Sequence, residues 1–171
     1  MKIFAYCSNM NSNRLKKRVP SAMKICNASL EGYSFAFNKK STDGSVKGNI
    51  KQTNNANDKV WGVVFEIDEK EKNKLNDAEG LGNGYNETMI DVLGTEGQLI
   101  KAQVYIADSG AIDNNLHPYD WYKEYVVSGA KENKLPEGYI NALENFQAVE
   151  DLDIRRSQKH FKATGKIYKQ I

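Results

Sequence analysis

The run of residues 60–67 constrains the fold of this chain more than any other feature of its sequence. It is almost continuous in apolar and β-branched residues and is interrupted only by Gly62 and Glu66. Such a run is typical of a central strand that is buried on both faces. Asp68 follows as a good N-cap, and residues 69–78 have the pattern of a charged surface helix. The chain must therefore bury this strand inside a sheet and continue from it into a helix.

The other strand patterns lie in the first two thirds of the chain. Short apolar or alternating segments predict strands at residues 3–6, 22–38, 86–93 and 99–107. In the last segment the apolar side chains alternate along one face, so Tyr105 points to the other face. The polar residues 39–58 predict a loop or a mobile flap.

Helical patterns dominate the last third of the chain. Helices are predicted over residues 119–130, from Pro136 onward and over 153–161, in addition to a short helix over 11–19. Because strands come first and helices last, the predicted class is α+β with a mainly antiparallel sheet. The length of 171 residues fits a single domain, residues 1–171.

The charge pattern argues against a nucleic-acid partner. The net charge is only +2, and basic and acidic residues are mixed along the chain. A basic cluster near the end is interpreted as a solvated face. It consists of Arg155, Arg156, Lys159, Lys162, Lys166 and Lys169.

The same composition predicts no membrane partner and a cytoplasmic location. No apolar run is long enough to span a membrane, and the first residues lack the apolar core of a secretory signal. Cys7 and Cys26 do not make a disulfide framework, so both thiols are expected to be free in a reducing compartment. His117 and His160 lie far apart in the sequence, and the spacing of a metal site is missing.

Two short segments carry most of the chemical information. Residues 4–10 form a strand that runs directly into a polar loop, which can present backbone N–H groups to an anion. Residues 79–85 begin with Glu79 and continue as a glycine-rich turn, which places a single carboxylate in a distinctive position. We expect the strand that ends at Tyr6 and the turn at Glu79 to meet at one mouth of the sheet and form a single cavity.

These segments and several others resemble the γ-glutamylcyclotransferase family, whose fold is also called AIG2-like. The Tyr-Gly-Ser-Asn loop of that family is similar to Tyr-Cys-Ser-Asn at residues 6–9. Its central signature resembles residues 60–65 followed by a short helix and Glu79-Gly80. Its C-terminal helical segment resembles residues 129–133, followed by Leu135-Pro136 and Tyr139. The resemblance extends from Phe4 to about Leu143.

The resemblance implies a small, mainly antiparallel β-barrel flanked by helices. It also implies a reaction, in which a γ-glutamyl-amino acid or another γ-glutamyl amide becomes 5-oxoproline and a free amine. Glu79 matches the general acid/base of the family. Such an intramolecular cyclisation needs no cofactor and no metal. The expected partner is a small-molecule γ-glutamyl substrate, and the expected oligomeric state is a monomer or a homodimer.

The resemblance further implies two groups of substrate-binding residues. One group matches the loop that binds the γ-glutamyl group through its backbone and consists of Tyr6, Cys7, Ser8, Asn9, Met10 and Asn11. The other group matches tyrosines that line the pocket and consists of Tyr85, Tyr105 and Tyr122. Tyrosines can close such a pocket and donate O–H groups without adding charge.

Cys7 is the main departure from the family pattern, which has glycine at this place. Two alternatives therefore stay open. In one, Cys7 impairs the loop and leaves a γ-glutamyl-binding protein without turnover. In the other, Cys7 is a nucleophile paired with His117 or His160 in a Cys–His hydrolase. The sequence also leaves the identity of the leaving amine open.

Overall fold

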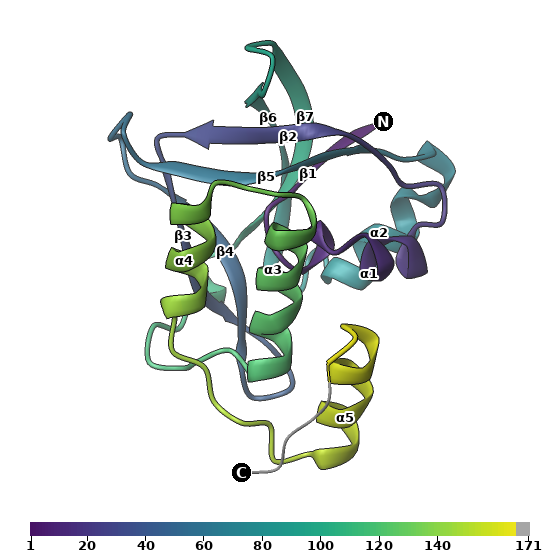
Figure 1. Ribbon diagram of the computed structural model, residues 1–171, viewed down its shortest axis with the longest axis vertical. Coiled ribbons are helices and arrows are strands. Elements are labelled where there is room, and N and C mark those ends of the chain that lie inside the picture. The colour runs from purple at the N-terminus through teal and green to yellow at the C-terminus, as the bar shows by residue number, and fades with distance from the viewer. Residues whose placement is uncertain (167–171) are drawn as a thin grey trace.

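The strands of the chain form a closed barrel and a separate two-stranded ribbon (Figure 1). The computed structural model describes residues 1–166. The strands are β1 (Lys2–Ala5), β2 (Met23–Glu31), β3 (Tyr33–Lys40), β4 (Val46–Gln52), β5 (Lys59–Glu66), β6 (Tyr85–Gly94) and β7 (Leu99–Ala107).

The barrel has the strand order β1-β5-β2-β6-β7 and closes through β1 and β7. Its neighbouring strands are antiparallel except at this closure, where β1 and β7 run parallel with Ile3 opposite Gln103. The predicted α+β class and the mainly antiparallel barrel are confirmed. The central position predicted for residues 60–67 is also confirmed, because β5 lies between β1 and β2.

Two hydrophobic clusters explain why β5 is apolar on both faces. Val60 and Val64 belong to a cluster that draws on all five barrel strands. Val63 and Phe65 belong to a second cluster, which includes residues of the helices packed against the barrel. The alternation along β7 is likewise as predicted, because Tyr105 lies in this second cluster whereas its apolar neighbours lie in the first.

The helices gather on one side of the barrel (Figure 1). They are η1 (Ser8–Met10), α1 (Ser12–Arg18), η2 (Glu69–Glu71), α2 (Lys72–Glu79), η3 (Ser109–Ala111), α3 (Asp120–Glu132), α4 (Glu137–Asn145) and α5 (Ile154–Ala163). Side-chain caps begin several of them: Asn11 accepts from the Arg14 amide, and Asp68 accepts from the Lys70 amide. At its other end α2 stops because Gly80 adopts a left-handed conformation with a φ of 70°. Within residues 1–166, the helices are too short or too polar to cross a bilayer.

The prediction of a loop over residues 39–58 is wrong. The end of β3 and the whole of β4 lie in this segment, and the two strands pair as an antiparallel ribbon. The segment looks polar because Val46 and Ile50 are its main apolar anchors, and both are fully buried. The strand predicted over 22–38 is in fact two strands, which are separated at Gly32 by a turn with a φ of 74°.

Part of the basic cluster near the chain end holds the fold together. Arg156 donates two hydrogen bonds to the buried Asp151 carboxylate, at 2.5 and 2.6 Å. Lys166 pairs with Glu124 at 2.6 Å. These ion pairs attach α5 and the segment after it to α3 and the segment before α5, whereas Lys169 lies outside the described residues.

Helix α3 approaches the segment after β1 so closely that a side chain would not fit at Gly129. A Cβ at this position would lie 2.6 Å from the Asn11 amide nitrogen and 2.8 Å from the Met10 carbonyl carbon. Asn133, the C-cap residue of α3, donates to the Met10 carbonyl oxygen at 2.8 Å. Glycine at position 129 therefore lets α3 fix η1 by direct backbone packing.

We predict that Gly129→Ala lowers the free energy of unfolding by about 1–3 kcal/mol, because helix and loop must move apart. The matched control is Gly138→Ala in α4, where no atom lies within 4 Å of the added Cβ. The control should be unchanged or more stable by up to about 1 kcal/mol. Urea unfolding of both variants measures the difference, and equal stabilities would show that the close approach has no energetic weight.

Candidate active site

The N-terminal loop directs the start of a short helix toward the mouth of the barrel. In η1, the Met10 amide donates to the Cys7 carbonyl at 2.9 Å, and the Asn11 amide donates to the Ser8 carbonyl at 3.3 Å. The amides of Ser8 and Asn9 precede these bonds, so they lie at the end of the helix where N–H groups have no intrahelical acceptor. This end of η1 is therefore suited to receive an anionic or carbonyl oxygen.

Glu79 meets this loop across the cavity. Its Oε1 accepts a hydrogen bond from Asn9 Nδ2 at 2.8 Å and one from Arg18 Nη1 at 2.5 Å. Arg18 Nη1 also donates to Asn9 Oδ1 at 2.8 Å, so the three side chains form one network. The Glu79 side chain remains 18% exposed. The expected meeting of the strand that ends at Tyr6 with the turn at Glu79 is thus observed.

Three tyrosines from different elements converge near the loop. The Tyr85 hydroxyl donates to the Gly48 carbonyl at 2.5 Å, and the Gly48 amide donates to the Tyr122 hydroxyl oxygen at 3.2 Å. The Tyr6 hydroxyl donates to the Tyr105 carbonyl at 2.5 Å. Burial raises the pKa of Tyr6, Tyr85 and Tyr122, so all three stay neutral hydroxyls at physiological pH.

Two adjoining cavities lie over these groups. The larger has a volume of about 530 Å³ and is lined in part by Ser8, Glu79, Tyr85 and Tyr122. The smaller, of about 30 Å³, shares Ser8, Glu79 and Tyr85 with it and reaches deeper toward Tyr6. The predicted residues that line at least one of the two cavities are Tyr6, Cys7, Ser8, Asn9, Glu79, Tyr85, Tyr105 and Tyr122.

Two predicted binding residues are placed differently. The Met10 side chain is fully buried in the core, and the Asn11 side chain caps α1 by accepting from the Arg14 amide. Their backbone amides are occupied by the carbonyls of Cys7 and Ser8. Because η1 consumes both N–H groups, Met10 and Asn11 shape the loop and do not line either cavity.

Cys7 fits the loop without backbone strain. Its φ is −120°, which an L-amino acid adopts freely. The thiol lies against the ribbon at Gly48, where an added Cβ would be only 2.2 Å from the Cys7 sulfur. Burial raises the pKa of Cys7, and the nearby Glu79 raises it further. The neutral thiol is therefore favoured over the nucleophilic thiolate.

The histidines of the alternative Cys–His pair serve other contacts. The His160 ring stacks on Trp121 with the ring centres 4.0 Å apart, and its Nδ1 lies 3.4 Å from the Tyr125 hydroxyl. The backbone carbonyl of His117 accepts from the Val46 amide at 3.4 Å. These contacts belong to the packing of α3, α5 and the ribbon.

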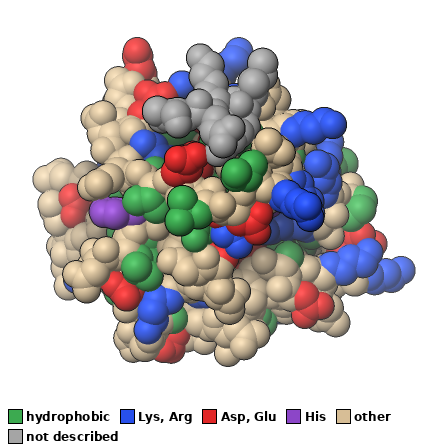
Figure 2. Space-filling view, turned by 90° about the horizontal axis from the view of Figure 1, so that it is seen from below, with side chains coloured by type: hydrophobic (Ala, Val, Ile, Leu, Met, Phe, Trp, Pro, Cys, Tyr) green, Lys and Arg blue, Asp and Glu red, His purple; other side chains and the backbone are tan. Residues whose placement is uncertain are grey.

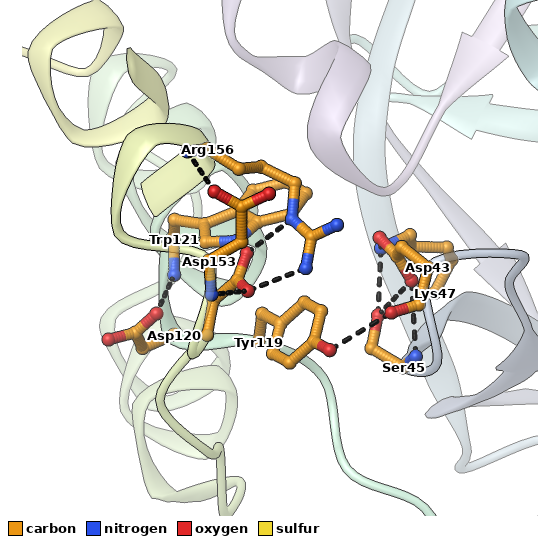
Figure 3. Close-up of polar contacts among 9 residues, drawn as sticks. Asp43, Ser45, Lys47, Tyr119, Asp120, Trp121, Asp153 and Arg156 are labelled. Carbon is orange, nitrogen blue, oxygen red and sulfur yellow. Dashed lines mark hydrogen bonds and ion pairs between the residues drawn. The ribbon is translucent and has the colours of Figure 1, made fainter. Parts of the chain in front are cut away.

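Sequence reasoning missed the cationic wall of the larger cavity. Arg14 and Arg18 come from α1, and Lys39 and Lys47 come from the ribbon. The i,i+4 spacing of the two arginines was a usable signal, because it places both on one face of α1. The two lysines had no signal, since their segment was predicted to be a loop. Lys47 is held by Asp43 at 2.7 Å and Ser45 at 2.9 Å, in a turn that faces Tyr119 (Figure 3).

The chain is similar to known proteins over nearly all of its length. The AIG2-like family profile matches residues 59–143. The chain is 30% identical to the gamma-glutamylcyclotransferase of Homo sapiens, with 98% of this chain and 84% of that protein covered. It is 31% identical to the gamma-glutamylcyclotransferase of Mus musculus, over 86% of this chain and 79% of that protein. A solved structure described as gamma-glutamyl cyclotransferase has a TM-score of 0.84 at 28% identity, covering 95% of this chain and 98% of that one.

The contact between Cys7 and Gly48 predicts a strong energetic coupling. Gly48→Ala should lower the free energy of unfolding by about 1–3 kcal/mol, because the new methyl group overlaps the Cys7 sulfur. In a Cys7→Gly background the same substitution should be much less harmful, since the 2.2 Å overlap with the sulfur is removed and the next nearest atom, in the Phe35 ring, lies at 3.1 Å. A double-mutant cycle of urea unfolding measures this coupling, and strictly additive effects would contradict the contact.

Proposed function

Because this chain belongs to the γ-glutamylcyclotransferase family of enzymes, we propose that it converts a γ-glutamyl amide into 5-oxoproline and a free amine. In this proposal Glu79 moves the proton, and the loop after β1 holds the γ-glutamyl group. The observation that carries it is the meeting of Glu79 with that loop, in which Asn9 Nδ2 lies 2.8 Å from Glu79 Oε1 at the edge of the cavity. One short ligand at this place touches both.

The reaction needs no reactant other than the substrate. The α-amino nitrogen attacks the γ-carbonyl carbon, and the new C–N bond closes a five-membered ring. The original amide C–N bond then breaks, and the proton lost by the attacking nitrogen ends on the leaving amine. Well-oriented intramolecular reactions gain up to about 7–11 kcal/mol from geometry alone. The main tasks of the protein are therefore to orient the substrate and to transfer one proton.

Glu79 suits both halves of the proton transfer. Arg18 and Asn9 bind the same oxygen, Oε1, and so hold the carboxylate in one orientation. The other oxygen of Glu79, Oε2, accepts no hydrogen bond from residues 1–166. It can therefore accept the proton and return it. A positioned acid/base of this kind contributes about 10²–10⁴-fold to the rate.

The groups around Glu79 match the remaining needs of the substrate. The amides of Ser8 and Asn9 at the start of η1 can stabilise the oxyanion that develops on the γ-carbonyl. The Tyr122 hydroxyl accepts from Gly48 and keeps its own proton to donate. Since the buried tyrosines are neutral, they add donors without a competing charge.

We predict that Glu79→Gln lowers turnover by about two to four orders of magnitude. The amide oxygen of glutamine can still accept from Asn9 and Arg18, so ligand binding and stability should be retained. Release of 5-oxoproline from γ-glutamylalanine measures turnover, and calorimetric titration measures binding. The control is Glu69→Gln, the same change at an exposed residue of η2. If Glu79→Gln stays within about threefold of the parent enzyme, another residue is the base.

Cys7→Gly tests the alternative of an impaired or thiol-dependent protein. Because φ at Cys7 is negative and the flanking loop residues are unchanged, the substitution should keep or raise cyclotransferase activity. The same release assay checks it, with circular dichroism to confirm the fold. Loss of turnover with an intact fold would mean that the thiol takes part in the chemistry. Activity that appears only in the variant would mean that Cys7 had blocked the site.

A further inference from the structure

We infer that the leaving amine of the preferred substrate carries further carboxylates, as in an acidic peptide whose first residue is γ-glutamyl. The inference rests on the proposed function of the Glu79 site and specifies the substrate class. It is carried by two neighbouring cationic cavities, one at Glu79 and one at α5, which share Arg14 and Arg18 and which we call the cationic cleft.

The cleft consists of two cavities. The larger, of about 530 Å³, contains Glu79 and is bordered by Arg14 and Arg18. A second cavity, of about 230 Å³, has the same two arginines in its wall and continues to Lys17 and Lys159. The two arginines border both spaces, so a ligand anchored at Glu79 that extends past them would reach α5. A single amino acid as the leaving group would leave this outer part of the cleft unused.

Basic side chains outnumber acidic ones along the whole cleft. The acidic groups in its lining are Asp77 and Glu79. The basic groups are Arg14, Lys17, Arg18, Lys39, Lys47 and Lys159. Within the described part of the chain, Arg18 pairs with Glu79 and Lys47 with Asp43, and the other four form no ion pair. A cleft lined by one sign of charge concentrates ligands of the opposite sign.

Lys39 is the most buried of the four cations that form no ion pair. It is only 8% exposed, and its ammonium donates to the Asn83 carbonyl at 3.0 Å and lies 4.8 Å from the centre of the Tyr85 ring. Burial lowers the pKa of Lys39, and the carboxylates of Glu79 and Asp43, which raise it, offset this effect only in part. An anionic group of the ligand in the cavity would compensate this charge.

Arg14 has a similar environment at the junction of the two cavities. Its Nε donates to the Ser8 hydroxyl at 3.1 Å, and its guanidinium lies 4.3 Å from the centre of the Tyr125 ring. Burial lowers the pKa of Arg14, and the neighbouring Arg18 lowers it further. The guanidinium is thus positioned by neutral partners, which leaves its charge available to a carboxylate of the ligand.

The outer end of the cleft depends on the docking of α5. Arg156 donates to the Asp151 carboxylate, which also accepts from the Trp121 indole at 2.7 Å, and these bonds attach α5 beside α3. Lys159 lies on this helix and lines the second cavity together with Lys17 of α1. Figure 2 shows the molecule from the side on which α5 lies, and Lys and Arg side chains are concentrated at the right of this view. The fold therefore builds the cationic end from two separate helices.

The experiment compares 5-oxoproline release from three substrates at low and high salt. They are γ-glutamylalanine, γ-glutamyl-glutamyl-glutamate and γ-glutamyl-ε-lysine. The acidic peptide should have a kcat/KM at least about tenfold above that of γ-glutamylalanine at low salt, mainly through a lower KM. Added salt should reduce this advantage, because it screens charges in an open cleft.

Matched lysine variants test the outer cleft. Lys17→Ala and Lys159→Ala should each lower the preference for the acidic peptide by about threefold to tenfold, as expected for one rim charge. Lys16→Ala and Lys162→Ala remove exposed charges from the same two helices outside the cavity linings and should leave the preference unchanged. Equal effects in all four variants would show a general charge effect and overturn the inference.

The outcomes separate this inference from the proposed function. Turnover of γ-glutamylalanine without any preference for the acidic peptide would overturn the inference and leave the function intact. A preference for γ-glutamyl-ε-lysine would do the same, because its leaving group brings an added cation. A failure to release 5-oxoproline from all three substrates would overturn the proposed function and this inference with it.

Discussion

The candidate site depends on the close packing of α3 against the segment after β1. Gly129 lets the two backbones approach so closely that an added Cβ would lie 2.6 Å from the Asn11 amide nitrogen. Asn133 reinforces the contact by binding the Met10 carbonyl at 2.8 Å. With η1 fixed, Asn9 can reach Glu79, although the two residues are 70 positions apart in the chain. The close approach at Gly129 therefore helps to determine where Glu79 meets the loop after β1.

The candidate site has two regions that differ in their charge. Near Glu79 the buried tyrosines are neutral, and Arg18 forms the ion pair with the Glu79 carboxylate. Farther out, the cationic cleft supplies charge where a ligand would extend. Gly48 of the ribbon contacts several residues near Glu79. Its carbonyl accepts from Tyr85, and its amide donates to Tyr122. Because it has no side chain, it also leaves room for Cys7. The departure from the family's loop glycine at position 7 is thus accommodated by a glycine in the ribbon.

Sequence patterns predicted the parts of the structure that local residues determine. The apolar run of β5, the alternation of β7 and the cap at Asp68 each gave a correct element. The resemblance to the family predicted that Glu79 and the Tyr6–Asn9 loop lie at the same site, and the structure places them together. The ribbon was missed because β4 is held by pairing with β3 and by two buried side chains, a tertiary effect with little local signal. Lys39 and Lys47 were missed with it, and Met10 was assigned to the site because a motif does not show which loop amides a helix consumes.

The central claim is that the γ-amide is broken by the substrate's own amine, and isotope labelling tests it most directly. The enzyme is incubated with γ-glutamylalanine in water enriched in ¹⁸O, and the products are identified by mass spectrometry. Intramolecular attack predicts 5-oxoproline and alanine without ¹⁸O, because water does not enter the bond that forms. Release of glutamate with ¹⁸O in its γ-carboxylate would instead show hydrolysis, as a cysteine nucleophile would produce, and would contradict the cyclisation.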